Sequence, residues 1–483
     1  MQDWHYPLQV LLFLLAHGLS WLAVGHALLT KQDPRSALGW VVTALFLPGL
    51  GALLYVLFGI RRSDSRAARL LQAVRLDVFP ERPRLHGGAD LQTPPGDVPD
   101  ASLPGEYAYL ARIGQGLTGR HVCGGNSVTP LFNGDEAYPV MLDAINRACG
   151  HVFLSTYIFN AGDTGAAFCR ALADAARRGC DVRVLVDGVG CLYSLSKPWR
   201  ALKRQGVRTA LFLPPRLWRP SLALNLRNHR KVLVCDGTGF TGGMNIADAH
   251  KTRYGGAAIH DIHYRCIGPL VAQLQEAFLL DWAFSTGEHT PAPVIIEEQG
   301  GASLCRVLLD GPGSGADLLH DVLCTALTAA RRRIRIMTPY FLPTHELMSA
   351  LRTAALRGVD VQVILPGKNN LPYVHWACLH LLRGLVQMGV RMFFRPPPFA
   401  HTKLLLLDDA YVQIGSANLD PRSLRLNFEL NVEVFDPRLA ARLQTHFAQV
   451  RHTSREIDTH TLRNLPLPWR LRNAACWLFS PYL

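Results

Sequence analysis

The sequence lacks the cysteine patterns of a metal site. Its eleven cysteines are scattered over 483 residues, with no C-x2-C pair and no cluster of His and Cys. Such a distribution argues against a structural zinc site. In a reducing compartment these thiols act as small apolar side chains rather than as disulfide partners. The sequence therefore implies no metal and no other cofactor.

Acidic residues and lysines are both scarce. There are 37 Asp and Glu against 50 Lys and Arg, which leaves a formal net charge of +13. This excess implies an acidic partner, either nucleic acid or an anionic membrane surface. Only seven of the basic residues are lysines: Lys31, Lys197, Lys203, Lys231, Lys251, Lys368 and Lys403. In such an arginine-rich chain, a lysine in a repeated context indicates a need for a compact single-point donor.

Charge is missing altogether from two N-terminal stretches. Residues 7–29 and 37–59 are each 23 residues long and contain no Asp, Glu, Lys or Arg. Each is long enough to span a bilayer, and the first lacks the basic start and cleavage site of a signal peptide. The short gap between them contains Asp33-Pro34, which predicts a tight turn. Residues 1–62 are therefore predicted to form a transmembrane helical hairpin, which favours a membrane over nucleic acid as partner.

The flanking charges predict an orientation for this hairpin. Lys31 and Arg35 lie in the turn, whereas five arginines follow the second stretch: Arg61, Arg62, Arg66, Arg69 and Arg75. By the positive-inside rule, the turn is expected outside and everything after residue 60 in the cytoplasm. Residues 80–105 are then rich in Pro, Gly and Asp and show no periodicity. Residues 63–105 are predicted to form a basic segment and a flexible linker.

Two matching stretches in the remaining chain carry the candidate chemistry. Each reads H-x-K-x4-D, followed by a Gly-containing turn that ends in Asn. The first copy supplies His229, Lys231, Asp236, Gly243 and Asn245. The second copy supplies His401, Lys403, Asp408, Ser416 and Asn418. Two copies with matching sequels indicate an internal duplication rather than a chance pattern.

The spacing predicts where these side chains point. His and Lys two apart on a strand project from one face. The apolar runs 232–234 and 404–407 that follow are typical of buried strands. Each half is therefore expected to present one imidazole and one ammonium at a strand end, and two halves could surround one phosphate. Asp236 and Asp408 lie past the strand end and are expected to brace the site.

The two halves resemble each other beyond the motifs. In each, a strand (152–159 or 334–341) lies between two helical segments and is followed by a second strand (179–186 or 358–365). Strands that alternate with helices favour mixed or parallel sheets covered by helices. We therefore predict an α/β fold made of two halves, residues 106–295 and 296–483, with one site at their pseudo-twofold axis.

An acidic residue follows each Gly-containing turn. Asp261 follows the first and Glu429 the second. A histidine that attacks or transfers a proton needs an acceptor on its other ring nitrogen, which fixes its tautomer and direction. We assign Asp261 to His229 and Glu429 to His401, each within its own half. The alternative is that these acids lie on the surface or pair with Arg265 and Arg425.

The doublet resembles the phospholipase D superfamily, and the chain as a whole is similar to the bacterial cardiolipin synthases of that superfamily. The resemblance implies an inner-membrane enzyme that converts two phosphatidylglycerols into cardiolipin and glycerol. It implies that His229 is the nucleophile, forming a phosphohistidine, and His401 the acid and base, although the symmetry allows the reverse. No obligatory protein partner is evident.

Elementary chemistry supports the same site. Lys231, Lys403, Asn245 and Asn418, with backbone donors near Gly243 and Ser416, could hold the non-bridging oxygens as charge develops. Alternatives remain open. With water as acceptor the protein would be a membrane-anchored phosphodiesterase or nuclease, and without chemistry it would be a lipid-binding scaffold.

Two further segments mix aromatic residues with arginine. The tail 465–479 is expected either to lie in the lipid interface or to pack on the domain as a C-terminal helix. Residues 211–220 could form a rim that meets the membrane.

Overall fold

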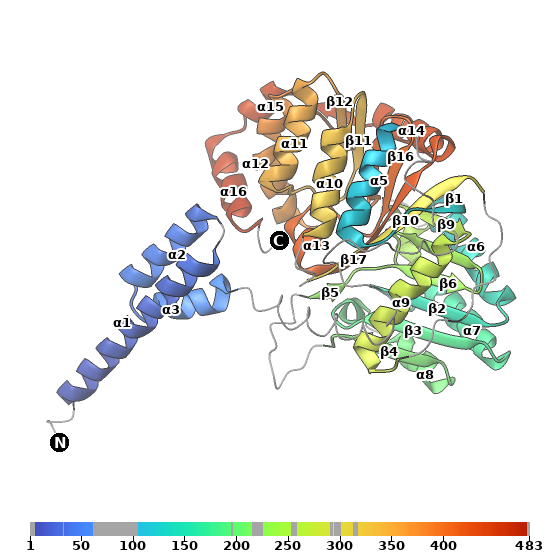
Figure 1. The fold of residues 1–483 in the computed structure, drawn as a ribbon, viewed down its shortest axis with the longest axis horizontal. Helices are drawn as coiled ribbons and strands as arrows, with labels where there is room; N and C mark the ends of the chain where they lie inside the picture. Colours follow the sequence, from blue (N-terminus) through green and yellow to red (C-terminus); the bar gives the residue numbers. More distant parts are fainter. Residues whose placement is uncertain are drawn as a thin grey trace. The chain divides into compact units, whose positions relative to one another are not determined.

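The computed structural model describes residues 5–31, 33–60, 105–194, 197–214, 226–252, 258–289, 293, 301–312 and 317–480. The chain forms two compact units, Met1–Arg66 and Ala67–Leu483 (Figure 1). Nearly all of the predicted basic segment and linker lies outside the described residues, so that prediction stays a prediction.

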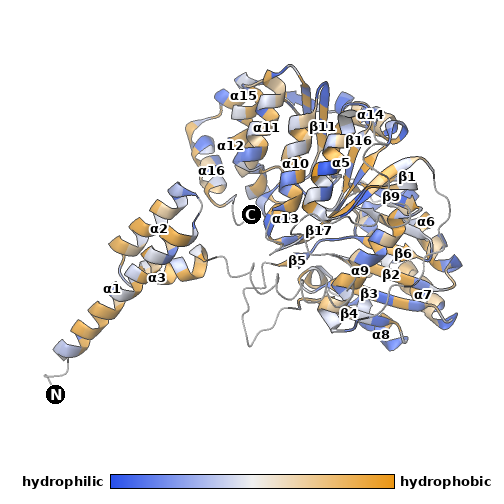
Figure 2. Cartoon of the chain, viewed as in Figure 1, coloured by the Kyte–Doolittle hydropathy of each residue, from blue (hydrophilic) through white to orange (hydrophobic). Residues whose placement is uncertain are grey.

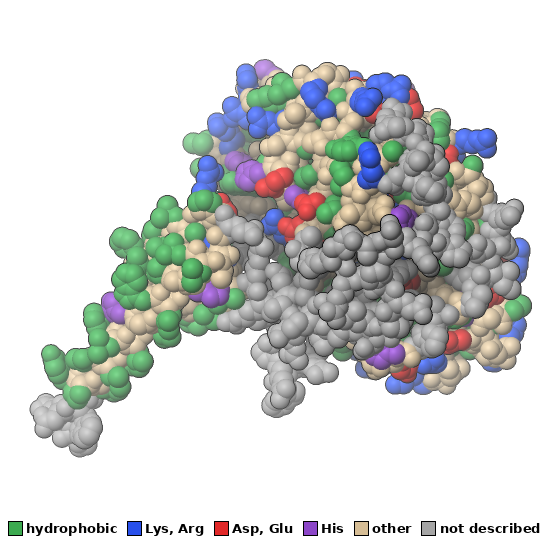
Figure 3. Space-filling model, viewed as in Figure 1, with side chains coloured by type: hydrophobic (Ala, Val, Ile, Leu, Met, Phe, Trp, Pro, Cys, Tyr) green, Lys and Arg blue, Asp and Glu red, His purple; other side chains and the backbone are tan. Residues whose placement is uncertain are grey.

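The first unit is built on one long apolar helix. α1 (His5–Thr30) is followed by α2 (Pro34–Phe46), whose N-terminus is capped by the Asp33 carboxylate. The chain then continues as α3 (Leu50–Leu54) and a π-helical turn, η1 (Tyr55–Gly59). Figure 2 shows that α1 and α2 are hydrophobic over most of their length, and in Figure 3 hydrophobic side chains cover their outer surface.

The segment after α2 returns along α1. Gly49 N donates to Ser20 Oγ (3.2 Å), His26 Nδ1 lies 2.7 Å from Tyr55 Oη, and Lys31 Nζ donates to Gly59 O (2.5 Å). The residue numbers of both partners rise together, so α3 and η1 run parallel to α1. The end of η1 therefore lies beside the turn that begins at Lys31.

This arrangement corrects the predicted hairpin. α2 has 13 residues, about 20 Å of helix, which is shorter than the bilayer core. Pro48 disfavours helix at the residue before it, and Gly49 adopts a positive φ of 78°. The prediction that 37–59 forms one continuous helix is wrong, because this segment is divided into α2, α3 and η1. Among the described residues, one helix, Tyr6–Thr30, is long and apolar enough to cross.

The second unit contains one continuous mixed sheet. Its strand order is β18-β13-β12-β11-β15-β16-β17-β10-β1-β9-β7-β6-β2-β3-β4. In the first half the strands are β1 (Cys123–Phe132), β2 (His151–Thr156), β3 (Asp181–Asp187), β4 (Arg208–Phe212), β6 (Val232–Cys235), β7 (Thr238–Gly242) and β9 (Ile262–Ile267). Their counterparts are β10 (Ser303–Asp310), β11 (Arg333–Met337), β12 (Asp360–Pro366), β13 (Arg391–Arg395), β15 (Leu404–Leu407), β16 (Tyr411–Gly415) and β17 (Asn427–Phe435), with β18 (Arg455–Ile457) at one edge. The antiparallel pair of β1 and β10 joins the halves.

Helices cover both faces of this sheet (Figure 1). The first half contributes α6 (Asn133–Arg147), α7 (Asp163–Arg177), α8 (Pro198–Arg204) and α9 (Leu270–Thr286). The second contributes α10 (Leu318–Ala329), α11 (His345–Leu356), α12 (Pro372–Val386), α13 (Pro421–Arg425), α14 (Pro437–His452), α15 (Thr459–Arg463) and α16 (Leu467–Leu478). The short segments η3 (Gly190–Tyr193) and η5 (Asp248–His250) are 3-10 turns. The predicted duplicated α/β fold is confirmed.

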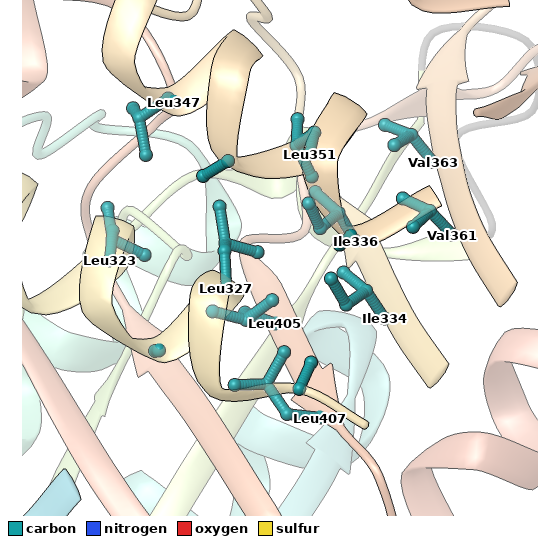
Figure 4. Close-up of a cluster of buried hydrophobic side chains, with 14 of the residues drawn as sticks. Leu323, Leu327, Ile334, Ile336, Leu347, Leu351, Val361, Val363, Leu405 and Leu407 are labelled. Atoms are coloured by element: carbon teal, nitrogen blue, oxygen red, sulfur yellow. The ribbon is translucent and has the colours of Figure 1, made fainter. Parts of the chain in front are cut away.

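The core shows why both faces need helices. In Figure 4, alternate strand residues such as Ile334, Ile336 and Val363 face leucines of α10 and α11. The intervening residues, such as Met337 and Leu406, belong to a separate core that includes α14. A strand that is apolar at successive positions buries both of its faces. α5 (Gly105–Thr118) falls almost entirely within the predicted first half, but it packs into the core of the second half.

The tail forms a helix that packs on the domain. Trp477 of α16 stacks on His380 of α12, with ring centroids 4.9 Å apart, and the Arg472 guanidinium lies over the Trp376 ring. Leu467, Trp469 and Leu471 on α16 stay exposed. One predicted alternative, the packed helix, is confirmed, and a membrane contact of the exposed face stays a prediction. Residues 215–220 of the predicted rim lie outside the described residues.

Candidate active site

Each motif histidine enters the site from a short strand that pairs with the other half. β5 (Arg227–Asn228) runs parallel to the start of β17, and His229 N donates to Phe428 O (2.9 Å). In the same way, β14 (Phe399–Ala400) pairs with β8 (Ile259–His260), and His401 N donates to His260 O (2.8 Å). The backbone of each half therefore positions the histidine of the other.

These strand pairings bring the acid of each half to the histidine of the other half. His229 Nδ1 lies 3.1 Å from Glu429 Oε2, and His401 Nδ1 lies 2.8 Å from Asp261 Oδ2. Each parallel pair sets the residue before a histidine beside the residue before the other half's acid. The prediction that each acid serves the histidine of its own half is therefore wrong. Both acids are buried rather than on the surface, and Arg425 pairs with Asp317 instead.

Gly243 and Ser416, the two positions with predicted phosphate-binding backbone donors, lie against the acids, and phosphate binding near Gly243 stays a prediction. A Cβ on Gly243 would lie 2.4 Å from Asp261 Oδ2, so only glycine leaves room for this carboxylate. Ser416 Oγ donates to Glu429 Oε2 (2.5 Å), and its carbonyl lies 3.1 Å from His229 Nδ1. Ser416 N already donates to Leu430 O. It is therefore not free to bind a phosphate, although the sequence predicted a phosphate-binding donor here. Both positions support the acids.

Both motif lysines are buried beside their histidines. Lys231 Nζ donates to His229 O (2.7 Å), and Lys403 Nζ donates to His401 O (2.6 Å). Lys403 Nζ also lies 3.0 Å from both ring nitrogens of His401. Burial lowers the pKa of Lys231 to about 7 and that of Lys403 to about 8. A bound phosphate would favour the charged form of both ammonium groups.

Burial also keeps the imidazoles neutral. It lowers the pKa of His229 to about 4, and burial together with the charge of Lys403 lowers the pKa of His401 well below its ordinary value. Burial opposes ionisation of Glu429, but the charges of His229 and Lys231 outweigh it and lower the pKa of Glu429 to about 2. Burial raises the pKa of Asp261. At neutral pH the site therefore holds a neutral imidazole beside an ionised Glu429.

These shifts predict a bell-shaped pH dependence for kcat/KM. Activity should fall below about pH 4, where His229 gains a proton and its lone pair is no longer free to attack. It should fall again above about pH 7 to 8, where Lys231 and Lys403 lose their protons. In kcat the alkaline limb should lie at higher pH, because bound phosphate stabilises both ammonium groups. Initial rates from about pH 3 to 10 would check both limbs. Lys231→Arg cannot deprotonate, and an alkaline limb unmoved by it would contradict the assignment to Lys231.

The two asparagines lie in the loops after β7 and β16. Asn245 Oδ1 accepts from Ile158 N (3.2 Å), so its amide group is held by the backbone. Asn418 Nδ2 donates to Ser423 Oγ (3.1 Å), and its buried Oδ1 has no hydrogen-bond partner in the described part of the chain. Phosphate binding by Asn245 and Asn418 stays a prediction.

Asp236 and Asp408 brace the sheet at the end of the motif strands away from the histidines. The Asp236 carboxylate accepts from the backbone N–H groups of residues 149, 150 and 151 at the start of β2. The Asp408 carboxylate accepts from those of residues 331, 332 and 333 at the start of β11. Both aspartates adopt positive φ, 47° and 49°. Asp236 and Asp408 were predicted to brace the site itself, but they brace the far end of the sheet instead, and neither faces the imidazoles.

Removing such a brace should cost stability rather than chemistry. Asp408→Ala leaves three backbone donors without their charged acceptor, and we expect the free energy of unfolding to fall by about 2–3 kcal/mol. The neighbouring Asp409→Ala removes exposed ion pairs with Arg332 and Arg333 and should cost less than about 0.5 kcal/mol. Urea unfolding of the solubilised protein measures both. Equal effects of the two substitutions would contradict the bracing role.

Two residues at the site were not predicted from the sequence. The Tyr157 ring contacts the His229 ring edge-on, with centroids 5.3 Å apart, and Lys231 Nζ lies 5.5 Å from the Tyr157 centroid. Arg230 is buried, pairs with Asp281 (2.6 Å), and donates to the backbone carbonyls of Glu429 and Asp310. The position of Arg230 inside the motif could have marked it as a site residue, but its partners lie far away in sequence and could not be predicted.

Comparisons with known proteins agree over nearly the whole chain. A family model described as "Cardiolipin synthase, PLD-like domain" matches residues 141–282 and 323–451, and one described as "Phospholipase_D-nuclease N-terminal" matches residues 18–59. The major cardiolipin synthase ClsA of Bacillus subtilis is 30% identical over 464 residues, which cover 94% of this chain and 95% of the relative. Cardiolipin synthase A of Pseudomonas fluorescens is 32% identical over 480 residues and 98% of each chain.

One solved structure shows the same fold. The phosphatidylserine synthase of Haemophilus influenzae superimposes with a TM-score of 0.61 at 16% identity, covering 78% of this chain and all of that one. At this identity the likeness concerns the fold alone.

Proposed function

Because this chain belongs to the cardiolipin synthases of the phospholipase D superfamily and is a phosphatidyltransferase, we propose that it joins two phosphatidylglycerols through a phosphohistidine on His229. One observation carries this mechanism. Two imidazoles and two ammonium groups, one of each from either half, converge in a buried place, and each imidazole is held by the other half's acid.

In the first step, His229 Nε2 attacks phosphorus while the bond to the departing glycerol breaks. Glu429 accepts the hydrogen bond of Nδ1–H and stabilises the positive charge that grows on the ring. Lys231 and Lys403 stabilise the negative charge on the non-bridging oxygens. The anionic phosphate of the bound donor lipid favours the protonated form of His401. His401 then gives its Nε2 proton to the glycerol oxygen and becomes neutral, while Asp261 holds its other nitrogen.

In the second step, His401 takes the proton from a hydroxyl of the second phosphatidylglycerol. This oxygen forms a bond to phosphorus as the N–P bond breaks, which restores His229 and yields cardiolipin. One phosphodiester replaces another, so no nucleotide is needed. The runner-up is hydrolysis by water. Against it, the side chains of His229 and His401 are only 11% and 12% exposed, which limits the access of water to the phosphohistidine.

A product assay tests this proposal. The detergent-solubilised protein is incubated with phosphatidylglycerol, and cardiolipin and free glycerol are followed together. Equal rises in both products support transfer. Phosphatidic acid in place of cardiolipin would mean that water is the acceptor and would replace the transferase with the phosphodiesterase.

The N-terminal apolar helix associates the protein with the membrane. We further infer that α1 crosses the membrane once and that residues 34–59 enter and leave the membrane on the same side. Lys31 contacts Gly59, so the turn and the arginines after residue 60 in the sequence belong to the same side. Residues 1–6 contain no Lys or Arg. The positive-inside rule then puts the second unit in the cytoplasm and the N-terminus outside.

Maleimide labelling checks this topology. Cys149 is exposed in the second unit, and Gln2→Cys adds a thiol at the N-terminus. A membrane-impermeant maleimide should label Gln2→Cys in intact spheroplasts and should label Cys149 only after lysis, with Cys149→Ser as the control. Labelling of both positions only after lysis would show that residues 34–59 cross the membrane after all.

A further inference from the structure

The proposed reaction brings two phosphodiester anions together. One becomes attached to His229, and the other belongs to the acceptor lipid, whose hydroxyl attacks. Two like charges at short distance repel, so the acceptor phosphate needs its own cation beside the site. Water or a neutral alcohol as acceptor makes no such demand.

Arg227 lies in a suitable place for this role. It is half-buried, two residues before His229, and its Nη1 donates to Tyr157 Oη (3.2 Å). The Tyr157 ring in turn contacts the His229 ring. The Arg227 Nε is buried without a hydrogen-bond partner in the described residues. Asp187, the nearby acid, already accepts from the backbone N–H groups of residues 189, 190 and 228.

A second arginine approaches the same place from α13. Arg422 lies on this helix, which leads into β17, and the first residue of β17, Asn427, pairs with Arg227. Arg422 is also half-buried. Burial lowers the pKa of Arg422, the charge of Arg227 adds to this shift, and the Asp420 carboxylate opposes it, so the two guanidinium groups lie in one partly desolvated space. An anion between them would relieve this repulsion.

The pseudo-twofold axis does not repeat this pair. Counted from the motif histidines, the counterpart of Arg227 is Phe399. Counted from the motif asparagines, the counterpart of Arg422 is Ala249. One side of the site is therefore basic and the other has no charge at these positions. The two substrates carry the same headgroup phosphate, so an uneven site distinguishes which lipid donates and which accepts.

We infer that Arg227 and Arg422 bind the phosphate of the acceptor phospholipid while its hydroxyl attacks the phosphohistidine. This inference rests on the proposed function. Planar guanidinium groups suit a phosphate that must be held in one orientation, because each can make two parallel hydrogen bonds to it.

Two reactions of the same preparation separate acceptor binding from donor chemistry. Exchange of labelled glycerol into phosphatidylglycerol uses the donor phosphate alone, whereas cardiolipin formation also needs the acceptor phosphate. For Arg227→Gln and for Arg422→Gln, we expect the ratio of cardiolipin formation to glycerol exchange to fall at least about tenfold, with a higher KM for phosphatidylglycerol as acceptor. Arg227→Lys keeps a charge and should restore part of the ratio.

Arg391→Gln is the matched control. Arg391 on β13 forms an exposed ion pair with Glu456 on β18, and its loss should leave the ratio unchanged. Equal loss of both reactions in the Arg227 and Arg422 variants would assign these residues to the donor or to the fold and overturn the inference. An unchanged ratio would overturn it as well. If the wild-type protein performs neither reaction, the proposed function itself fails, and this inference with it.

Discussion

His229→Ala abolishes cardiolipin formation, with an expected fall in kcat of at least about 10⁴-fold. No phosphohistidine can form at this position, and the reaction loses its nucleophile. His401→Ala removes only the proton transfers and should lower kcat by roughly 10²–10⁴-fold. Both rates are measured with phosphatidylglycerol, and thermal melting of each variant confirms that the protein still folds.

A donor with a better leaving group separates the two roles. Phosphatidyl-p-nitrophenol releases an anion that needs no proton, so the first step with His401→Ala should recover much of the wild-type rate. The same donor should not rescue His229→Ala. Rescue of His229→Ala in place of His401→Ala would show that the two roles are reversed.

Substitution of each acid should have the same kind of effect as substitution of the histidine that it contacts. Glu429→Gln removes the charge that stabilises the His229 imidazolium, and we expect kcat to fall by about 10²–10³-fold. Asp261→Asn should cause a loss of similar size through His401. Release of p-nitrophenol then discriminates between them, because the activated donor should rescue Asp261→Asn and should not rescue Glu429→Gln.

If each acid served the histidine of its own half, the pattern of rescue would be the opposite. Glu456→Gln, which removes an exposed carboxylate on β18, provides a charge control and should leave both rates near wild type. Full rescue of Glu429→Gln would contradict the crossed arrangement. The experiment therefore tests the feature of the site on which the sequence and the structure disagree.

Much of the fold follows from local pattern. The strand at β2 and its counterpart at β11, with the helices around them, were predicted from periodicity within a few residues of their observed bounds. The duplicated motifs predicted two matching halves and one shared site. The membrane segment was harder, because residues 37–59 have the composition of a crossing helix. Contacts with Ser20, His26 and Lys31 of α1 and its turn show that this segment returns.

The sequence by itself identified the side chains of the candidate site: two imidazoles, two lysines and two acids in matched contexts. Those residue types and their spacing lie within short stretches, where strand geometry relates neighbours directly. Only the tertiary structure decided which acid holds which histidine. Asp261 and His401 are 140 residues apart, and Glu429 and His229 are 200 apart. Their partnership depends on two short parallel pairings, β5 with β17 and β14 with β8, which form only when the halves pack together.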